Sequence, residues 1–176
     1  HYQPIIDLAT RRVSKAEALL RWQHPHFGLI PPDDFIARAE EIGLIDEIGH
    51  WVFEEAAHAA KRFGEIADAH FQIGVNVSPM QFRVPNRCRT WLATLDEMGL
   101  PPHRLSLDVS ESLLLEMDGH AEQLLESLRD AGMGITLDGF GVGRSPLGCL
   151  TKFKISSLKL DRSFARELAG HHDNGA

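Results

Sequence analysis

Six polar residues that suit metal or phosphate chemistry are spread along the chain, each within or at the end of a short apolar run. They are Gln3, Glu17, Asn76, Asp108, Asp138 and Lys159. Carboxylate and amide oxygens are the ligands that Mg²⁺ and Mn²⁺ prefer in proteins. Because stretches of helical character separate these runs, we predict strand ends that converge on one site, as in a β/α barrel.

Considered singly, these residues have more ordinary interpretations. An isolated glutamate such as Glu17 at a strand edge is usually solvated. Asn76 alone suits the Asx geometry of a turn. Lys159 alone suits a charge on the protein surface. The residue types by themselves leave these alternatives open.

Strand-like and helix-like segments alternate along the chain. We predict strands at residues 1–8, 16–21, 71–77, 104–109, 133–138 and 155–160. We predict a first helix that Asp33 or Asp34 caps and Gly43 ends, and a second helix that begins near Asp46. We predict three more helices over residues 86–98, 118–131 and 146–152. Between them we predict a polar turn at Arg11, Arg12, Ser14 and Lys15, a loop over 23–32, a glycine-rich loop over 139–148 and a disordered tail at 170–176.

This alternation predicts a parallel sheet in a single domain over residues 1–176. A complete β/α barrel needs eight strands and typically ~250 residues. Six predicted strands in 176 residues therefore indicate either an open sheet or a barrel that lacks its last two units. Because the chain starts abruptly at His1 inside an apolar segment, we favour the second interpretation and expect a piece of a longer polypeptide.

Composition narrows the classes of function. A net charge of −7 argues against a protein that grips DNA by counterion release. Two cysteines, Cys88 and Cys149, without close spacing fit a reducing compartment. No run approaches ~18 apolar residues. We therefore expect a cytoplasmic domain, whose parent protein could be anchored to a membrane through segments outside this sequence.

Three other features favour ordinary interpretations. Residues 139–143 suggest a dinucleotide loop, but Arg144 stands where the last glycine of that fingerprint belongs. His24 and His26 flank a proline without the HExxH spacing of a zinc site. We assign the three tryptophans to core or loop packing: Trp22, Trp51 and Trp91.

The segment around Glu17 resembles the signature of EAL domains, the bacterial cyclic di-GMP phosphodiesterases, because Glu17-Ala18-Leu19 lies within residues 16–22. The likeness continues in the family's order through residues 2–5, 32–45, 76–78 with Gln81, 108–112, 137–141 and 158–164. It covers essentially residues 1–166, and the ordered series is far more specific than the tripeptide. It favours a shared ligand site, in a TIM-like (β/α) barrel with about six of eight strands present.

The resemblance implies metal-dependent hydrolysis of cyclic di-GMP to linear pGpG in bacterial signalling. It implies that Mg²⁺ or Mn²⁺ is held by Glu17, Asn76, Asp108 and Asp138. It makes Lys159 and Glu17 the catalytic residues, with Lys159 orienting or activating the water. It assigns ligand contacts to Gln3 and Arg21, a place beside the metal and water to Asp161, and bracing of the loop at Gly139 to Glu111.

Several positions depart from the family pattern. Asp108 stands where the family has Glu, Gly139 where it has Asp, and residues 142–144 replace Thr-Gly-Tyr. A complete domain of the family continues past the position of Ala176 with two more segments, one bearing an acidic ligand and one a substrate-contacting Gln, and this sequence does not include them. We therefore expect these residues alone to hydrolyse cyclic di-GMP slowly or not at all. A degenerate domain that senses cyclic di-GMP or docks a protein partner is the alternative.

The resemblance also implies partners. It predicts an upstream sensor or GGDEF-type domain in the intact protein, and it allows a homodimer through the loop over 139–145. An unrelated metabolic β/α protein remains a third and weaker hypothesis. Binding of cyclic di-GMP without linear product would select the sensor over the enzyme.

Overall fold

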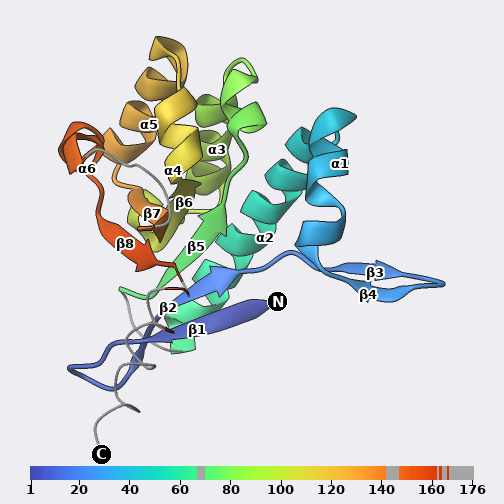
Figure 1. The fold of residues 1–176 in the computed structure, drawn as a ribbon. Helices are drawn as coiled ribbons and strands as arrows, with labels where there is room; N and C mark the ends of the chain where they lie inside the picture. Colours follow the sequence, from blue (N-terminus) through green and yellow to red (C-terminus); the bar gives the residue numbers. More distant parts are fainter. Residues whose placement is uncertain (67–69, 142–146, 162, 164–165, 167–176) are drawn as a thin grey trace, which may run out of the picture.

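A curled six-stranded sheet forms the centre of the computed structural model, which describes residues 1–66, 70–141, 147–161, 163 and 166 (Figure 1). The strands lie in the order β1-β2-β5-β6-β7-β8. Their bounds are β1 Tyr2–Ile6, β2 Val13–Ala18, β5 Gln72–Asn76, β6 Leu105–Ser110, β7 Gly134–Phe140 and β8 Ser157–Leu160. The predicted tail at 170–176 and much of the predicted glycine-rich loop lie outside the described residues.

The sheet is parallel except at its first pair. β1 runs antiparallel to β2, so the prediction of a wholly parallel sheet is wrong at this edge. The remaining neighbours, from β2 to β8, pair in parallel. The antiparallel pair forms because only six residues connect the two strands, too few for the crossover that parallel strands need.

The turn between β1 and β2 lies earlier than predicted. The Asp7 Oδ1 atom accepts hydrogen bonds from the backbone nitrogen of Thr10 at 2.6 Å and from its Oγ1 at 2.8 Å. Arg11 adopts a left-handed conformation with φ 56°. These residues complete the reversal, so Ser14 and Lys15 belong to β2 and not to a turn. β2 consequently begins and ends three residues before the predicted strand at 16–21.

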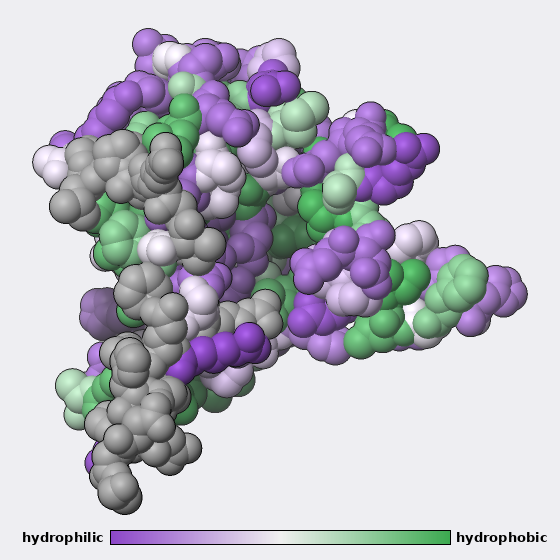
Figure 2. All heavy atoms as spheres, viewed as in Figure 1, coloured by the Kyte–Doolittle hydropathy of each residue, from purple (hydrophilic) through white to green (hydrophobic). Residues whose placement is uncertain are grey.

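The segment predicted as a loop over 23–32 contains a hairpin of two short strands, β3 Trp22–His24 and β4 Gly28–Ile30, which projects from the body of the molecule (Figure 1). The His24 Nδ1 atom accepts hydrogen bonds from the backbone nitrogens of His26 and Phe27 at 3.1 and 3.3 Å. This side-chain contact closes the turn. In Figure 2 hydrophobic side chains gather around the hairpin at the right of the view.

Helices cover the outer side of the sheet. The α-helices are α1 Ile36–Glu41, α2 Ile45–Ile66, α3 Arg87–Glu97, α4 Glu111–Glu116, α5 Gly119–Asp130 and α6 Leu147–Lys152. Short 3₁₀ helices lie at η1 Pro32–Asp34, η2 Pro79–Arg83 and η3 Pro102–Arg104. The predicted cap at Asp33 or Asp34 is wrong, because both residues lie in η1 and α1 begins after Phe35 without a side-chain cap.

The hydrophobic core lies between the sheet and these helices. Phe53 of α2 stacks on Trp91 of α3 with ring centroids 4.8 Å apart. The other two tryptophans are about half exposed, Trp22 beside the ring of Phe35 and Trp51 on the outer part of α2. Core packing is thus confirmed for Trp91, whereas Trp22 begins the strand β3 and Trp51 lies on α2, so neither belongs to the core or to a loop. No helix of the described residues combines the length and the apolar character that a membrane span requires.

Candidate functional site

The structure brings five of the predicted site residues together around one ammonium group. The Lys159 Nζ atom lies 2.6 Å from Asp108 Oδ2, 2.8 Å from Glu17 Oε2 and 3.9 Å from Asp138 Oδ2. The Asn76 Nδ2 atom donates a hydrogen bond to Glu17 Oε1 at 2.8 Å. Each residue comes from a different strand, so the sheet itself assembles this carboxylate cluster of Glu17, Asp108 and Asp138.

Strand pairing explains why these side chains meet. Asn76 pairs with Asp108 across β5 and β6, and Asp138 lies beside Ser110 across β6 and β7. Because neighbouring residues of a strand point to opposite faces, the apolar residues between them enter the core while the polar ones face the concave side. Glu17 and Asn76 lie at the carboxyl ends of their strands, where a β/α barrel places its active site.

A glycine that the sequence reasoning missed makes room for the cluster. Gly74, in the middle of β5, pairs with Glu17 on the neighbouring strand. A Cβ atom on Gly74 would lie 2.7 Å from Asp108 Oδ2, closer than atoms tolerate. Glycine inside a strand often marks such a close approach, and that signal was present in the sequence.

The carboxylates of the cluster and the Lys159 ammonium shift each other's pKa. Burial raises the pKa of Asp108, and the negative charges of Glu17 and Asp138 act in the same direction against the attraction of Lys159. Burial would by itself lower the pKa of Lys159, but Asp108 and Glu17 together outweigh it and raise that pKa. Lys159 therefore carries its proton at neutral pH. Three carboxylates then face one ammonium, which leaves the cluster with excess negative charge.

A cleft of about 440 Å³ opens beside the cluster. It is lined by Asn76, Val77, Asp108, Ser110, Asp138, Gly139, Leu160 and Asp161. Asp161 follows β8, where its backbone nitrogen donates to the carbonyl of Phe140 at 3.2 Å. The predicted neighbour of the metal and water thus lines the same cleft as three of the predicted metal ligands.

The donor chemistry of this cluster fits a hard divalent cation, because carboxylate and amide oxygens supply it. In the present arrangement, however, no three Asp, Glu, His or Cys side chains of the described residues converge closely enough to hold a metal ion. The reason is visible in the geometry: the Lys159 ammonium lies between Glu17 and Asp108, in contact with both. The oxygens are turned toward the lysine.

Two further predicted residues lie near the cluster. Gln3 pairs with Glu17 across β1 and β2, so their side chains lie on one face of the sheet. Glu111, at the start of α4, is only 9% exposed and accepts a hydrogen bond from the backbone nitrogen of Gly141 at 3.2 Å. This contact joins α4 to the segment that follows Gly139.

Arg21 is the predicted ligand contact that the structure leaves outside the cluster. Its Nη1 atom donates to the carbonyl of Leu20 at 2.6 Å. The side chain lines two neighbouring pockets, one beside His1 and one beside Trp22, and not the acidic cleft. A ligand that touches both Arg21 and the cluster would have to extend across the carboxyl end of β2.

A hydrogen-bonded loop behind Asn76 also escaped the sequence reasoning. The Ser78 backbone nitrogen donates to Gln81 Oε1 at 2.9 Å, and Ser78 Oγ donates to Glu40 Oε1 at 2.6 Å. Ser78 and Gln81 form a capping box at the start of η2. Serine followed three residues later by glutamine is the sequence signal of this motif. It holds the segment that leaves the site against α1.

A curled, mainly parallel sheet with an acidic cluster at the carboxyl ends of its strands defines a protein of the β/α-barrel class. The family model of the EAL domain matches residues 1–176 of the chain. The chain therefore belongs to the EAL domain family, as its motifs predicted.

Two relatives and one solved structure illustrate this membership. The chain is 39% identical over 168 residues to the uncharacterized protein sll1895 of Synechocystis, covering 96% of this chain and 24% of that protein. It is 38% identical over 176 residues to the bifunctional diguanylate cyclase/cyclic di-GMP phosphodiesterase MucR of Pseudomonas aeruginosa, covering 100% of this chain and 26% of MucR. The solved complex of the PaMucR phosphodiesterase with c-di-GMP matches with a TM-score of 0.88 and 38% identity, covering 96% of this chain and 68% of that one.

These matches confirm the predicted fold. The described strands form a curled half-barrel sheet like that of a solved EAL structure, which agrees with the prediction of a TIM-like (β/α) barrel. The chain spans about a quarter of the length of the two relatives named first.

Proposed function

We propose that this chain is a cyclic di-GMP phosphodiesterase domain, which hydrolyses cyclic di-GMP to linear pGpG with the help of a divalent cation. The single observation that carries the proposal is the contact of Lys159 with the carboxylates of Glu17 and Asp108, on the concave side of an EAL-type sheet. The names of MucR and of the PaMucR complex with c-di-GMP support the same ligand for this chain.

Mg²⁺ or Mn²⁺ would be held by oxygens of Glu17, Asn76, Asp108 and Asp138. When bound, such a cation neutralises charge on a phosphoryl group and lowers the pKa of water. The excess of negative charge in the cluster supports this role. Binding requires the Glu17 and Asp108 oxygens to turn from Lys159 toward the cation, because both now contact the ammonium.

Lys159 acts as a donor and not as a proton acceptor in this proposal. Its raised pKa keeps the ammonium charged, so it orients the attacking water or stabilises negative charge that develops on phosphate oxygens. Glu17 shares the catalytic role, because it is placed by both Lys159 and Asn76.

The remaining predicted residues would act on the ligand or on the loops around it. Gln3 would contact cyclic di-GMP from β1 and Arg21 from the segment after β2, with the Arg21 guanidinium released from the Leu20 carbonyl to bind a phosphate. Asp161 would face the water from the rim of the cleft. Glu111 would brace the segment after Gly139 through its bond to Gly141.

The test is product analysis with the full chain, cyclic di-GMP and either Mg²⁺ or Mn²⁺. We expect slow formation of pGpG, because Gly139 supplies no side chain and Asp108 is one methylene shorter than the glutamate of the family pattern. Lys159→Met and Glu17→Gln should each lower the rate by about a hundredfold or more. Lys61→Met is the matched control, since Lys61 lies on α2 and contacts the carbonyl of Met98.

Three results would decide between the hypotheses. Product that disappears with Lys159→Met but persists with Lys61→Met supports the enzyme. Binding of cyclic di-GMP by calorimetry without any product selects the degenerate sensor instead. Absence of both binding and product would contradict the proposal altogether.

The proposal extends to the setting of the domain. The bifunctional name of MucR supports an upstream GGDEF-type or sensor domain beside this one in a longer protein. We propose a cytoplasmic location for the domain, and a homodimer is an assembly that sedimentation of the chain would test.

A further inference from the structure

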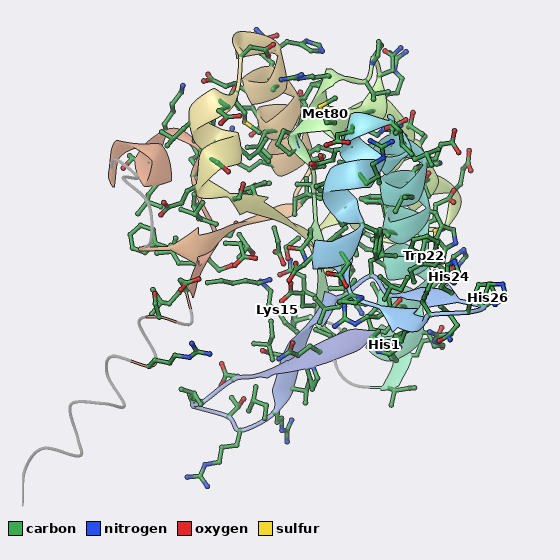
Figure 3. The ribbon with its side chains drawn as sticks, turned by 45° about the vertical axis from the view of Figure 1, so that its right-hand side comes forward. His1, Lys15, Trp22, His24, His26 and Met80 are labelled. Atoms are coloured by element: carbon green, nitrogen blue, oxygen red, sulfur yellow. The ribbon has the colours of Figure 1, made fainter. Side chains whose placement is uncertain are left out.

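Lys15 is a second lysine on the concave face of the sheet, two residues before Glu17 on β2. Ala16 and Ala18, which alternate with them, are buried in the hydrophobic core at 4% and 8% exposure. Lys15 and Glu17 therefore point to the opposite, concave side. Figure 3 shows Lys15 in the middle of the molecule, far from the labelled residues of the projecting hairpin.

Lys15 lies one step deeper than the carboxylate cluster. It pairs with Gln72 at the beginning of β5, whereas Glu17 pairs with Gly74 in the middle of that strand. It is half-buried, and its ammonium forms no hydrogen bond or ion pair with another residue in the described part of the chain. The Lys15 ammonium is therefore not committed to a contact partner among the described residues.

The electrostatic field of the cluster nevertheless reaches Lys15. Burial lowers the pKa of Lys15, attraction by Asp108 opposes that shift, and repulsion by Lys159 adds to it. The same two residues form the centre of the candidate site. Lys15 thus interacts with the cluster through space, from beyond the reach of an ion pair.

We propose that Lys15 is a positioning residue that competes with the divalent cation from beneath the carboxylate cluster. With Lys159 alone, three carboxylates retain two negative charges in excess, and Lys15 reduces that excess to one. The second ammonium steadies Asp108 when no cation is bound and weakens the attraction for a cation that enters from the cleft. This inference rests on the metal site of the proposed function and assigns it a built-in regulator of cation affinity.

The experiment measures Mn²⁺ binding to the full chain by calorimetry, without nucleotide. We expect Lys15→Gln to bind Mn²⁺ about tenfold more tightly than wild type, because a charge within the field of the cluster is removed. Lys15→Arg, which keeps the charge, should bind like wild type. Lys61→Gln changes the net charge equally but lies on α2, so it should leave the affinity unchanged.

Urea unfolding with and without Mn²⁺ tests whether Lys15 acts through its charge or only through packing. In the presence of a chelator, Lys15→Gln should unfold at a lower urea concentration than wild type, because Asp108 has lost a counter-charge. Added Mn²⁺ should then stabilise this variant more than it stabilises wild type. A residue needed only for packing would lose stability equally with and without the cation. Lys15→Met, which retains an unbranched apolar stem without the charge, decides the matter if Lys15→Gln does not fold.

The outcomes distinguish this inference from the proposed function. Equal Mn²⁺ affinities for wild type and Lys15→Gln overturn the inference and leave the metal site standing. Binding by Lys15→Gln but not by wild type supports the inference strongly. Absence of Mn²⁺ binding in both proteins overturns the inference together with the metal site. Tighter binding without hydrolysis of cyclic di-GMP supports the inference while the enzymatic proposal fails.

Discussion

The two faces of the sheet are built from the same strands but carry different kinds of interaction. On β6, Leu107 enters the hydrophobic core with no exposed surface, while its neighbour Asp108 faces the concave side and is 3% exposed. Both side chains are buried almost equally. One gains stability from apolar contacts, whereas the other depends on the ammonium of Lys159.

This difference teaches where stability and chemistry reside in the molecule. Burying a leucine is favourable in itself. Burying a carboxylate is unfavourable unless a partner compensates, and even a buried ion pair often contributes little to stability. The convex, helix-covered face therefore supports the fold, and the concave face keeps charged groups that the fold alone would not select. Substitutions on the two faces should separate stability from binding.

The largest loss of stability should come from the core behind the sheet. Phe53→Ala removes a fully buried ring that stacks on Trp91, and we expect the free energy of unfolding to fall by about 4 kcal/mol. Trp51→Ala, two residues earlier on α2 and 53% exposed, should cost less than about 1 kcal/mol. Urea denaturation measures both. Equal losses at the two positions would break the comparison between core and surface.

A substitution at Gly74 should lower both the stability of the protein and its affinity for a cation. The Cβ atom of Gly74→Ala would meet Asp108 Oδ2, so the strand or the carboxylate must move. We expect a loss of about 2 kcal/mol in unfolding free energy from the forced overlap. Mn²⁺ affinity, measured by calorimetry, should fall by about tenfold as the cluster is displaced.

Gly119→Ala is the matched control for that substitution. An added Cβ at Gly119 finds no atom within 4 Å, and the residue lies in the first turn of α5. It should leave stability and Mn²⁺ affinity unchanged or raise stability slightly. A Gly74→Ala protein that binds Mn²⁺ like wild type would show that Asp108 needs no such space.

The six strands of the central sheet and the convergence of polar residues on one site were predictable because both follow from local patterns. The apolar runs that contain Asn76, Asp108 and Asp138 form the neighbouring strands β5, β6 and β7, and parallel pairing brings these polar residues to one side of the sheet. The family motifs added which residues belong together. Neither pattern contains distances, so the contact of Lys159 with two carboxylates could only come from the structure.

The errors concentrate where a few side chains override weak backbone preferences. The hairpin of β3 and β4 depends on one imidazole, His24, that accepts two backbone hydrogen bonds. The turn after β1 depends on the carboxylate of Asp7. Lys15 was predicted in a turn because it is charged, although counting back two residues from Glu17 places it on the same face of the strand. Its role therefore went unnoticed.

A smaller loss of stability is expected at the hydrogen-bonded loop around Ser78, which follows β5 and contacts α1. Ser78→Ala removes an oxygen that accepts from the Met80 nitrogen at 3.2 Å and donates to Glu40 at 2.6 Å. We expect a loss of about 1 kcal/mol in unfolding free energy, as for other helix caps. Ser127→Ala on α5, whose hydroxyl donates to the Gln123 carbonyl, should change stability by less than about 0.5 kcal/mol. Indistinguishable urea midpoints for the two variants would refute the role of Ser78.

The smallest effect should appear only in alkaline solution, at Cys88 in the hydrophobic core. Burial raises the pKa of the Cys88 thiol from 9.0 to about 11, and Cys88 Sγ contacts the Leu124 carbonyl. The unfolded chain ionises this thiol above pH 9.0, while the folded chain keeps it neutral until about pH 11. The raised pKa therefore adds stability below pH 9.0, and this stability is lost as the pH rises toward about 11.

Cys88→Ala isolates this contribution, because every lysine and tyrosine titrates in both proteins and cancels in the difference. Wild type should lose more unfolding free energy than Cys88→Ala between pH 9.0 and about 11, as measured by urea midpoints across that window. The convex face would then exclude a negative charge that the concave face, at Asp108, accepts with the help of Lys159. If the urea midpoints of the two proteins change in parallel with pH, the core tolerates a thiolate at Cys88. The two faces of the sheet would then differ in packing and not in their tolerance of a negative charge.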